Sequence, residues 1–264
     1  MRLVVIAALC SLTCAFPTMG QFVTANALER VFWIEFQGGR ASSFTIEVDG
    51  RQYLITARHV VATIKDGEEI RLSFDGEWRP FKVRRIPVSP READIAVLAL
   101  PRVLGALLPV TVTSDGLILG EQVHFLGFPY GLGLPGVLRD DGAPFPLVKH
   151  AIVAGFGPAG AVETLYLDGY NNEGFSGGPI VRRRSDGGTQ VVGVIKGYSA
   201  HDEKVTKDGT DTSLRYSVNT GIAIGVGIKH ALDAIALRPI GAPLANIDEV
   251  TPSGGPTKGL EAIP

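Results

Sequence analysis

Short apolar runs alternate with pairs of turn-forming residues along most of the chain, from Phe22 to Val226. Glycine and aspartate favour the backbone conformations of tight turns, and short apolar runs between such turns are typical of strands. The spacing therefore predicts an all-β protein of the barrel type. The pairs that mark the turns are Gly38-Gly39, Asp49-Gly50, Asp75-Gly76, Asp115-Gly116, Gly187-Gly188 and Asp208-Gly209.

The pattern changes after the last of these strands. Apolar residues recur at helical spacing over residues 226–237, which predicts a closing helix whose apolar face docks on a barrel. From residue 239 onward the sequence is rich in proline, glycine and small residues. We therefore expect one folded domain over residues 21–238 and a flexible tail over residues 239–264.

The composition fits a single folded domain. Hydrophobic residues make up 45% of the 264 positions, enough for a large core, and the 20% of charged residues argues against disorder. The formal net charge is −2, and lysine and arginine are scattered apart from the run of residues 182–184, which predicts a solvated turn. Nucleic acid is therefore not an expected partner.

The first 20 residues resemble a secretory signal peptide. One arginine precedes an apolar run over residues 3–15, which is shorter than the roughly 20 residues of a membrane-spanning helix. We therefore expect cleavage after Ala15 or Gly20 and no membrane span in the mature chain. Both cysteines, Cys10 and Cys14, lie in this segment, so no disulfide is expected. These features predict a secreted or periplasmic protein.

A serine among glycines is the first sign of chemistry. The stretch GFSGGP, residues 174–179, places Ser176 where the backbone can wrap tightly around its hydroxyl. An acyl-transfer serine needs an exposed hydroxyl and nearby backbone N–H groups that face the developing oxyanion, which favours glycine beside it. Taken alone, such a run is more often an ordinary loop.

Two further segments supply the partners that a serine nucleophile needs, namely a base and a carboxylate that orients the base. The apolar run YLITA carries His59 to the edge of a sheet, and Asp94 opens the apolar strand of residues 95–100. A carboxylate buried there needs a hydrogen-bond donor, and an imidazole N–H is suitable. Each residue alone also fits a structural role, but together with Ser176 they predict a catalytic triad.

These motifs, in this order, resemble those of the trypsin-like (chymotrypsin-fold) serine peptidases. TARHV, DIAVL and GFSGGP match that family's TAxHV, DIAxL and GxSGGP, and the resemblance spans about residues 40–232. The segments 42–61, 120–133 and 167–180 are similar to the bacterial Htr/Deg-type protease domain, here expected without a PDZ domain.

The resemblance implies a fold of two packed antiparallel six-stranded β-barrels with a short C-terminal helix. The first barrel would cover about residues 28–105 and supply His59 and Asp94. The second would cover about residues 112–226 and supply Ser176, with residues 101–115 as the bridge between the barrels.

The resemblance also implies a role for each motif. Ser176 would attack the scissile carbonyl, His59 would take and return the proton, and Asp94 would orient the imidazole. The N–H groups of Gly174 and Ser176 would form the oxyanion hole. The expected substrate-binding residues are Tyr170, Lys196, Gly197, Tyr198 and Ile222.

Three positions depart from the digestive members of that family. Phe175 replaces an aspartate that pairs with a newly cut amino terminus, which excludes that route of activation. Lys196 replaces a serine that supports the catalytic aspartate. Tyr170 replaces an aspartate that selects basic side chains, so a preference for lysine or arginine has no support. The apolar residues near these positions fit either a substrate pocket or barrel packing.

We therefore expect a serine endopeptidase that hydrolyses polypeptides through an acyl-enzyme and uses no cofactor. The histidines 124, 150, 201 and 230 stand far apart in the sequence and belong to no metal-binding motif, so no metal site is predicted. Two alternatives stay open: a binding protein whose triad is idle, and an esterase that uses the same triad. The oligomeric state also stays open.

Overall fold

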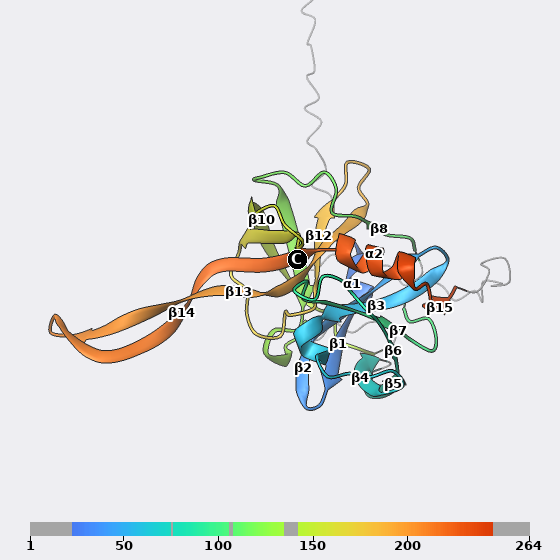
Figure 1. The fold of residues 1–264 in the computed structure, drawn as a ribbon, viewed down its shortest axis with the longest axis horizontal. Coiled ribbons are helices and arrows are strands. Elements are labelled where there is room, and N and C mark those ends of the chain that lie inside the picture. The colour runs from blue at the N-terminus through green and yellow to red at the C-terminus, as the bar shows by residue number, and fades with distance from the viewer. Residues whose placement is uncertain (1–22, 75, 106–107, 135–141, 245–264) are drawn as a thin grey trace, which may run out of the picture.

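The computed structural model describes residues 23–74, 76–105, 108–134 and 142–244. The predicted signal peptide and most of the predicted tail lie outside these residues. Two sheets make up most of the molecule (Figure 1). The strands are β1 (Val31–Phe36), β2 (Gly39–Val48), β3 (Arg51–Ala57), β4 (Glu69–Phe74), β5 (Glu77–Lys82), β6 (Arg84–Ile86), β7 (Ile95–Ala99), β8 (Thr111–Val112), β9 (Gln122–Gly127), β10 (Leu147–Phe156), β11 (Thr164–Asp168), β12 (Pro179–Arg183), β13 (Thr189–Lys207), β14 (Thr210–Gly227) and β15 (Ala242–Pro243), and the α-helices are α1 (Ala25–Glu29) and α2 (Lys229–Leu237).

The first sheet closes through one interrupted strand. β5 pairs with β4 and β6 pairs with β7, while only Val83 separates β5 from β6 along the chain. The other neighbours run in the order β4-β1-β2-β3-β7. The sheet therefore returns on itself as a barrel of six strands when β5 and β6 are taken as one.

The second sheet closes directly. Its order is β12-β9-β10-β11-β14-β13, and β12 also pairs with β13. β8 is added to the far edge of β13 in parallel orientation, whereas the six barrel strands are antiparallel. The predicted fold of two six-stranded antiparallel barrels is confirmed, and the turn pairs that the structure describes in full lie between strands, except that Gly39 is the first residue of β2.

Three apolar clusters hold the molecule together, one inside each barrel and one between them. In β7, Ala96 and Leu98 belong to the first barrel's interior, and Ile95 and Val97 belong to the cluster between the barrels. A strand that is buried on both faces has no polar face to show, which explains the continuous apolar run in this part of the sequence. The second barrel's interior is built around Phe125, Phe175, Leu165, Leu167 and Val192.

The closing helix starts later than predicted. β14 runs to Gly227, because Val226 is paired with Val194 on one side and Thr164 on the other, and α2 begins at Lys229. The predicted docking is confirmed, since Ala231 and Ile235 belong to the cluster between the barrels. No helix among the described residues is long and apolar enough to span a membrane.

The described residues that follow α2 extend past the predicted domain boundary at residue 238. Ala242 is buried and pairs with Gln52 of β3, and the N–H of Leu244 donates to the carbonyl of Gly50 (2.9 Å). The edge of β3 offers free backbone groups there, which explains why this first part of the predicted tail lies against the first barrel.

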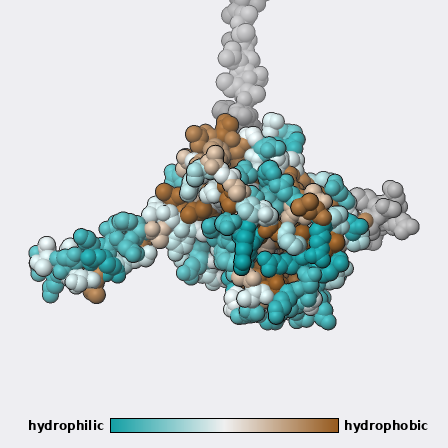
Figure 2. Space-filling model, in the orientation of Figure 1, coloured by the Kyte–Doolittle hydropathy of each residue, from teal (hydrophilic) through white to brown (hydrophobic). Residues whose placement is uncertain are grey.

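An arm formed by β13 and β14 leaves the second barrel as a long two-stranded ribbon (Figure 1). Residues 200–220 contain no buried side chain. The arm's surface is largely hydrophilic (Figure 2). Its turn, at Asp208 and Gly209, has two successive positive φ angles (52° and 78°), as expected for a tight hairpin.

The two barrels are in close backbone contact at Gly177. The N–H of Ser42 in β2 donates to the carbonyl of Ser176 (3.0 Å), and the N–H of Gly177 donates to the carbonyl of Ile195 in β13 (2.8 Å). A Cβ on Gly177 would lie 2.2 Å from both Ser42 O and Thr56 Oγ1. With φ at +83° as well, this position accepts only glycine.

We expect the variant Gly177→Ala to lose more than about 3 kcal/mol of unfolding free energy, because left-handed strain and overpacking add. Gly209→Ala is the matched control: its φ is +78°, but nothing lies within 4 Å of a Cβ there. The control should lose only about 1–2 kcal/mol, the cost of the left-handed strain alone. Equal losses in denaturant titrations would contradict this account of the contact between the barrels.

Candidate active site

His59 and Asp94 come together because β3 and β7 are paired. β3 ends at Ala57, which pairs with Ile95, so the residue before β7 lies beside the residues that follow β3. The 3-10 turn Arg58–Val61 then carries His59, and the N–H of Arg58 donates to the carbonyl of Asp94 (3.2 Å).

The Asp94 carboxylate holds His59 at two points. Oδ2 lies 2.6 Å from the imidazole Nδ1, and Oδ1 accepts a hydrogen bond from the backbone N–H of His59 (2.9 Å). The Asp94 side chain is 13% exposed and the His59 side chain is 50% exposed. A carboxylate at Nδ1 favours the tautomer that carries its proton there, which leaves Nε2 free to accept a proton.

Ser176 lies in the turn that leads into β12. Its hydroxyl donates to the carbonyl of Lys196 (3.3 Å), and the described residues show no hydrogen bond between this hydroxyl and His59. The two segments are nevertheless in contact, because a Cβ on Gly177 would lie 2.8 Å from the N atom of Ala57. The structure therefore brings the three predicted residues to one place, with the serine hydroxyl turned toward β13.

The N–H groups of Gly174 and Ser176 are each oriented by the carbonyl group of the same peptide unit, which belongs to the preceding residue. The carbonyl of Glu173 accepts from the N–H of Tyr130 (2.9 Å), and the carbonyl of Phe175 accepts from the N–H of Gly178 (2.8 Å). In a planar trans peptide the N–H points opposite to the carbonyl. The N–H groups of Gly174 and Ser176 therefore face away from these contacts, and neither has a partner among the described residues.

Ser42 is a site residue that the sequence analysis missed. Its side chain is buried, donates to the carbonyl of Gly174 (2.7 Å) and accepts from the N–H of Phe128 (2.9 Å). It thus links the first barrel to the end of β9 and to residues 170–178, the turn before β12 that carries the candidate nucleophile Ser176 and is called the nucleophile turn below. One serine within the polar run SSFT carries no sign of such a contact, because its partners are 86 and 132 residues away.

The predicted substrate-binding residues lie on three neighbouring segments. Gly197 pairs with Ile224 and accepts a hydrogen bond from Asn171 Nδ2 (2.8 Å). Lys196 is exposed, and its carbonyl receives the Ser176 hydroxyl. The side chains of Tyr170, Tyr198 and Ile222 are 55%, 37% and 39% exposed. These exposures favour a solvent-facing surface over barrel packing, the alternative left open above.

A cavity of ≈ 260 Å³ borders the nucleophile turn at Gly174. It is lined by Trp33, Arg40, Phe128, Tyr130, Gly131, Glu173 and Gly174. Because Gly174 belongs to its wall, a molecule in this cavity would touch the turn whose N–H groups are free.

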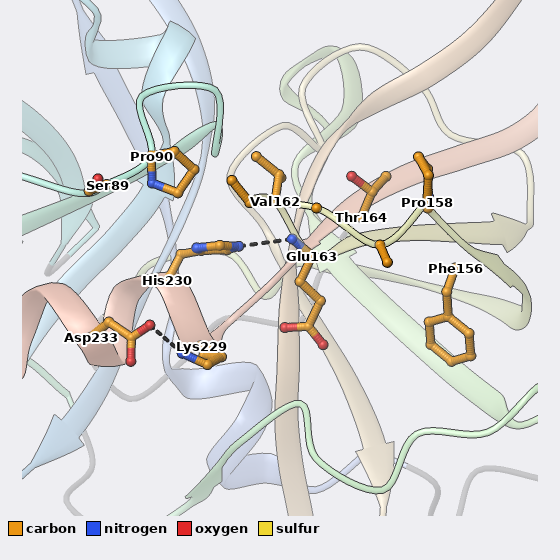
Figure 3. A pocket seen from close by; sticks show the side chains of 14 residues that line it. Ser89, Pro90, Phe156, Pro158, Val162, Glu163, Thr164, Lys229, His230 and Asp233 are labelled. Atoms are coloured by element: carbon orange, nitrogen blue, oxygen red, sulfur yellow. Dashed lines mark hydrogen bonds and ion pairs between the residues drawn. The ribbon is translucent and has the colours of Figure 1, made fainter.

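A second cavity, of ≈ 450 Å³, lies elsewhere, where α2 meets the segment between β10 and β11 (Figure 3). In it, His230 Nε2 accepts from the N–H of Glu163 (3.0 Å), and Lys229 is paired with Asp233 (2.5 Å). None of the predicted catalytic or substrate-binding residues lines this cavity. It is therefore separate from the candidate active site.

The structure also brings together two histidines that are distant in the sequence. His124 and His150 are paired across β9 and β10, with ring centroids 5.2 Å apart. Burial, and to a smaller extent the neighbouring His150, lower the pKa of His124. No group of three or more potential metal ligands occurs among the described residues.

Known structures share this fold at low sequence identity. The Rv3671c protease from M. tuberculosis H37Rv in an inactive form is 20% identical, with a TM-score of 0.50 over 82% of this chain and 91% of that one. A serine-to-alanine mutant of the same protein, also in an inactive form, gives 17% identity and a TM-score of 0.51 over 83% and 91%. A variant of the HtrA-type protease AlgW, solved with a tripeptide, gives 21% identity and a TM-score of 0.52 over 81% of this chain and 61% of that one. No curated protein matches the chain.

The double barrel is the chymotrypsin-type fold, which this chain shares with the HtrA-type protease AlgW. A family profile described as the trypsin-like peptidase domain matches residues 41–194, more than half of the chain. The chain therefore belongs to the trypsin-like peptidase family and is a hydrolase of the serine endopeptidase type.

The contacts of Ser42 lead to a prediction. Ser42→Ala should lower the free energy of unfolding by about 1–3 kcal/mol, because the buried N–H of Phe128 loses its partner. It should also lower turnover by about 10-fold to 10²-fold, short of the full loss of an oxyanion donor, because the Gly174 carbonyl is released.

Ser43→Ala is the matched control for this variant. Ser43 is equally buried, and its hydroxyl donates to the carbonyl of Phe32 (3.1 Å), away from the nucleophile turn. It should lose stability without losing turnover. If the two variants turn over substrate equally, Ser42 has no role in positioning the turn.

Proposed function

We propose that this chain is an exported serine endopeptidase that cleaves polypeptides through an acyl-enzyme, with Ser176, His59 and Asp94 as its triad. The observation that carries the proposal is the two-point contact of the Asp94 carboxylate with His59. A carboxylate that binds both the ring and the backbone of one histidine sets the direction in which its Nε2 faces.

The proposed chemistry begins with the Ser176 hydroxyl. It leaves the Lys196 carbonyl and turns to His59 Nε2, as catalytic hydrogen bonds often form fully only with substrate in place. As Oγ attacks the scissile carbonyl carbon, its proton passes to Nε2, and the carbonyl oxygen takes the negative charge. His59 then protonates the leaving amine, which departs and leaves an ester on Ser176. Water hydrolyses that ester by the same steps and restores the hydroxyl.

The N–H groups of Gly174 and Ser176 are proposed to stabilise the charged oxygen. Both are free of partners among the described residues, and the carbonyls of their peptides are held by other groups. Such fixed donors need no reorientation as the charge develops, which is why an oxyanion hole lowers the barrier. The cavity beside Gly174 would receive part of the substrate.

One observation favours an alternative, a binding protein of the same fold with an idle triad. In the described part of the chain, the Ser176 hydroxyl donates a hydrogen bond to the backbone carbonyl of Lys196 and forms none with His59. A reagent that labels only activated serines separates the two functions, because an idle hydroxyl does not react with it.

We expect a fluorophosphonate probe to label the wild-type protein and a variant with Ser217→Ala, an exposed serine of the arm that serves as control. Ser176→Ala should abolish both labelling and casein hydrolysis. Asp94→Asn should lower kcat by about 10⁴, because the imidazole then takes the wrong tautomer. Absence of labelling in the wild-type protein would favour the binding protein, and turnover of simple esters alone would favour an esterase.

Export is proposed from the first 20 residues, whose short apolar run follows a single arginine. Expression of the full chain in a bacterial host should yield a shortened protein outside the cytoplasm, with a new amino terminus after Ala15 or Gly20. Cell fractionation locates the protein, and amino-terminal sequencing identifies the cleavage site. An uncleaved chain in the cytoplasmic fraction would contradict the proposal.

A further inference from the structure

Lys149 is a partly buried cation at the end of the second barrel that carries residues 170–176. It lies on β10, where it pairs with Phe125, and it alternates with Ala151 and Val153, which are buried in the barrel's interior cluster. Because side chains two residues apart in a strand share one face, Lys149 continues this interior row toward the barrel end that carries residues 170–176.

The ammonium group of Lys149 contacts that turn at four points. Nζ donates to the carbonyl of Tyr170 and to Asn172 Oδ1 (2.7 Å). It also lies 5.3 Å from the centre of the Tyr170 ring and 5.8 Å from the centre of the Phe175 ring. All four contacts are attractive for a cation, since carbonyl oxygens and aromatic faces both carry negative partial charge.

The groups that contact the Lys149 ammonium at these four points are all neutral. Among the described residues Lys149 forms no ion pair, and its partial burial lowers the pKa of the ammonium from its ordinary value. The desolvation cost is therefore met by the turn itself, through its oxygens and its rings. A neutral side chain of the same length would supply none of these attractions.

The contacts continue from Lys149 to the N–H groups of the proposed oxyanion hole. Lys149 binds the side chain of Asn172. The backbone carbonyl of Asn172 in turn accepts a hydrogen bond from the N–H of Phe175 (3.3 Å). Phe175 is fully buried, packs against Phe125 with ring centroids 4.9 Å apart, and binds the N–H of Gly178 through its carbonyl. That carbonyl belongs to the peptide whose N–H is that of Ser176, so its orientation sets the direction of this donor.

We propose that Lys149 is a positioning residue whose ammonium group holds the turn 170–176 in the conformation that aims the N–H groups of Gly174 and Ser176 at the substrate. The inference rests on the proposed function. The cation is part of the folded barrel, so the turn is ordered without cleavage of the chain upstream. A carboxylate at position 175 could form an ion pair with Lys149. Phe175 contacts the ammonium group with its ring instead.

The test compares Lys149→Met, which keeps the bulk and removes the charge, with Lys204→Met on the exposed arm as control. We expect Lys149→Met to lower kcat on a peptide substrate by about 10² or more, as for a lost oxyanion donor, with KM changed less than about threefold. The rate of fluorophosphonate labelling should fall in parallel, while Lys204→Met should match the wild-type protein.

Rescue separates a positioning cation from a merely structural side chain. Lys149→Ala should regain turnover when propylammonium, which replaces the missing atoms and the charge, is added, and 1-propanol of the same size should have no effect. Lys149→Arg should retain turnover within about tenfold, because its guanidinium also donates two hydrogen bonds. If Lys149→Met does not fold, the rescue by propylammonium and the turnover of Lys149→Arg decide between a positioning cation and a structural side chain.

Wild-type kcat and labelling rate in Lys149→Met would overturn the inference while leaving the proposed function intact. A loss that neither propylammonium nor arginine restores would overturn it as well, since it would show a structural role. A wild-type protein that is not labelled would overturn the proposed function, and the inference with it.

Discussion

The absence of a side chain at Gly177 is the constraint on which the active site depends. At this residue the nucleophile turn of the second barrel lies directly on strands β2 and β3 of the first, with Ser42 O and Thr56 Oγ1 where a Cβ would be. His59 follows β3 by two residues, and Ser176 precedes Gly177 by one. The distance between His59 and Ser176, the proposed base and nucleophile, is therefore set by how closely the two backbones approach at Gly177, and any side chain at this point would separate them.

The nucleophile turn is held from three directions by groups of different kinds. Ser42 binds it from the first barrel through the carbonyl of Gly174, and Tyr130 binds it from the strand end of β9 through the carbonyl of Glu173. Lys149 holds it from within the second barrel. The contact of Tyr130 occupies the carbonyl of Glu173, so the N–H of Gly174 in the same peptide is left for another molecule. The burial of Phe175 among aromatic and aliphatic side chains supports this arrangement without any ion pair.

Much of the fold could be predicted because its signals are local. Turn pairs such as Asp49-Gly50 and Asp208-Gly209 mark strand ends by backbone preference alone, and the run of residues 95–100 shows a strand buried on both faces. The arm was missed because its turn predicts a hairpin but not how far the hairpin extends beyond the barrel. The start of α2 was predicted too early, because helical spacing at Val226 competes with two strand partners that only the folded barrel supplies.

The sequence by itself determined the candidate reactive residues: a serine among glycines, a histidine after one strand and an aspartate before another. It also determined the family to which these motifs belong. The tertiary structure decided which other side chains contact the segment that carries Ser176. Ser42 and Lys149 contact the turn through partners more than 20 residues away, and a polar or charged residue inside a strand has no local pattern that names its partner. Backbone preferences are properties of neighbouring residues, whereas the direction of a peptide N–H is set by whichever atom, however distant in the chain, binds the opposite carbonyl.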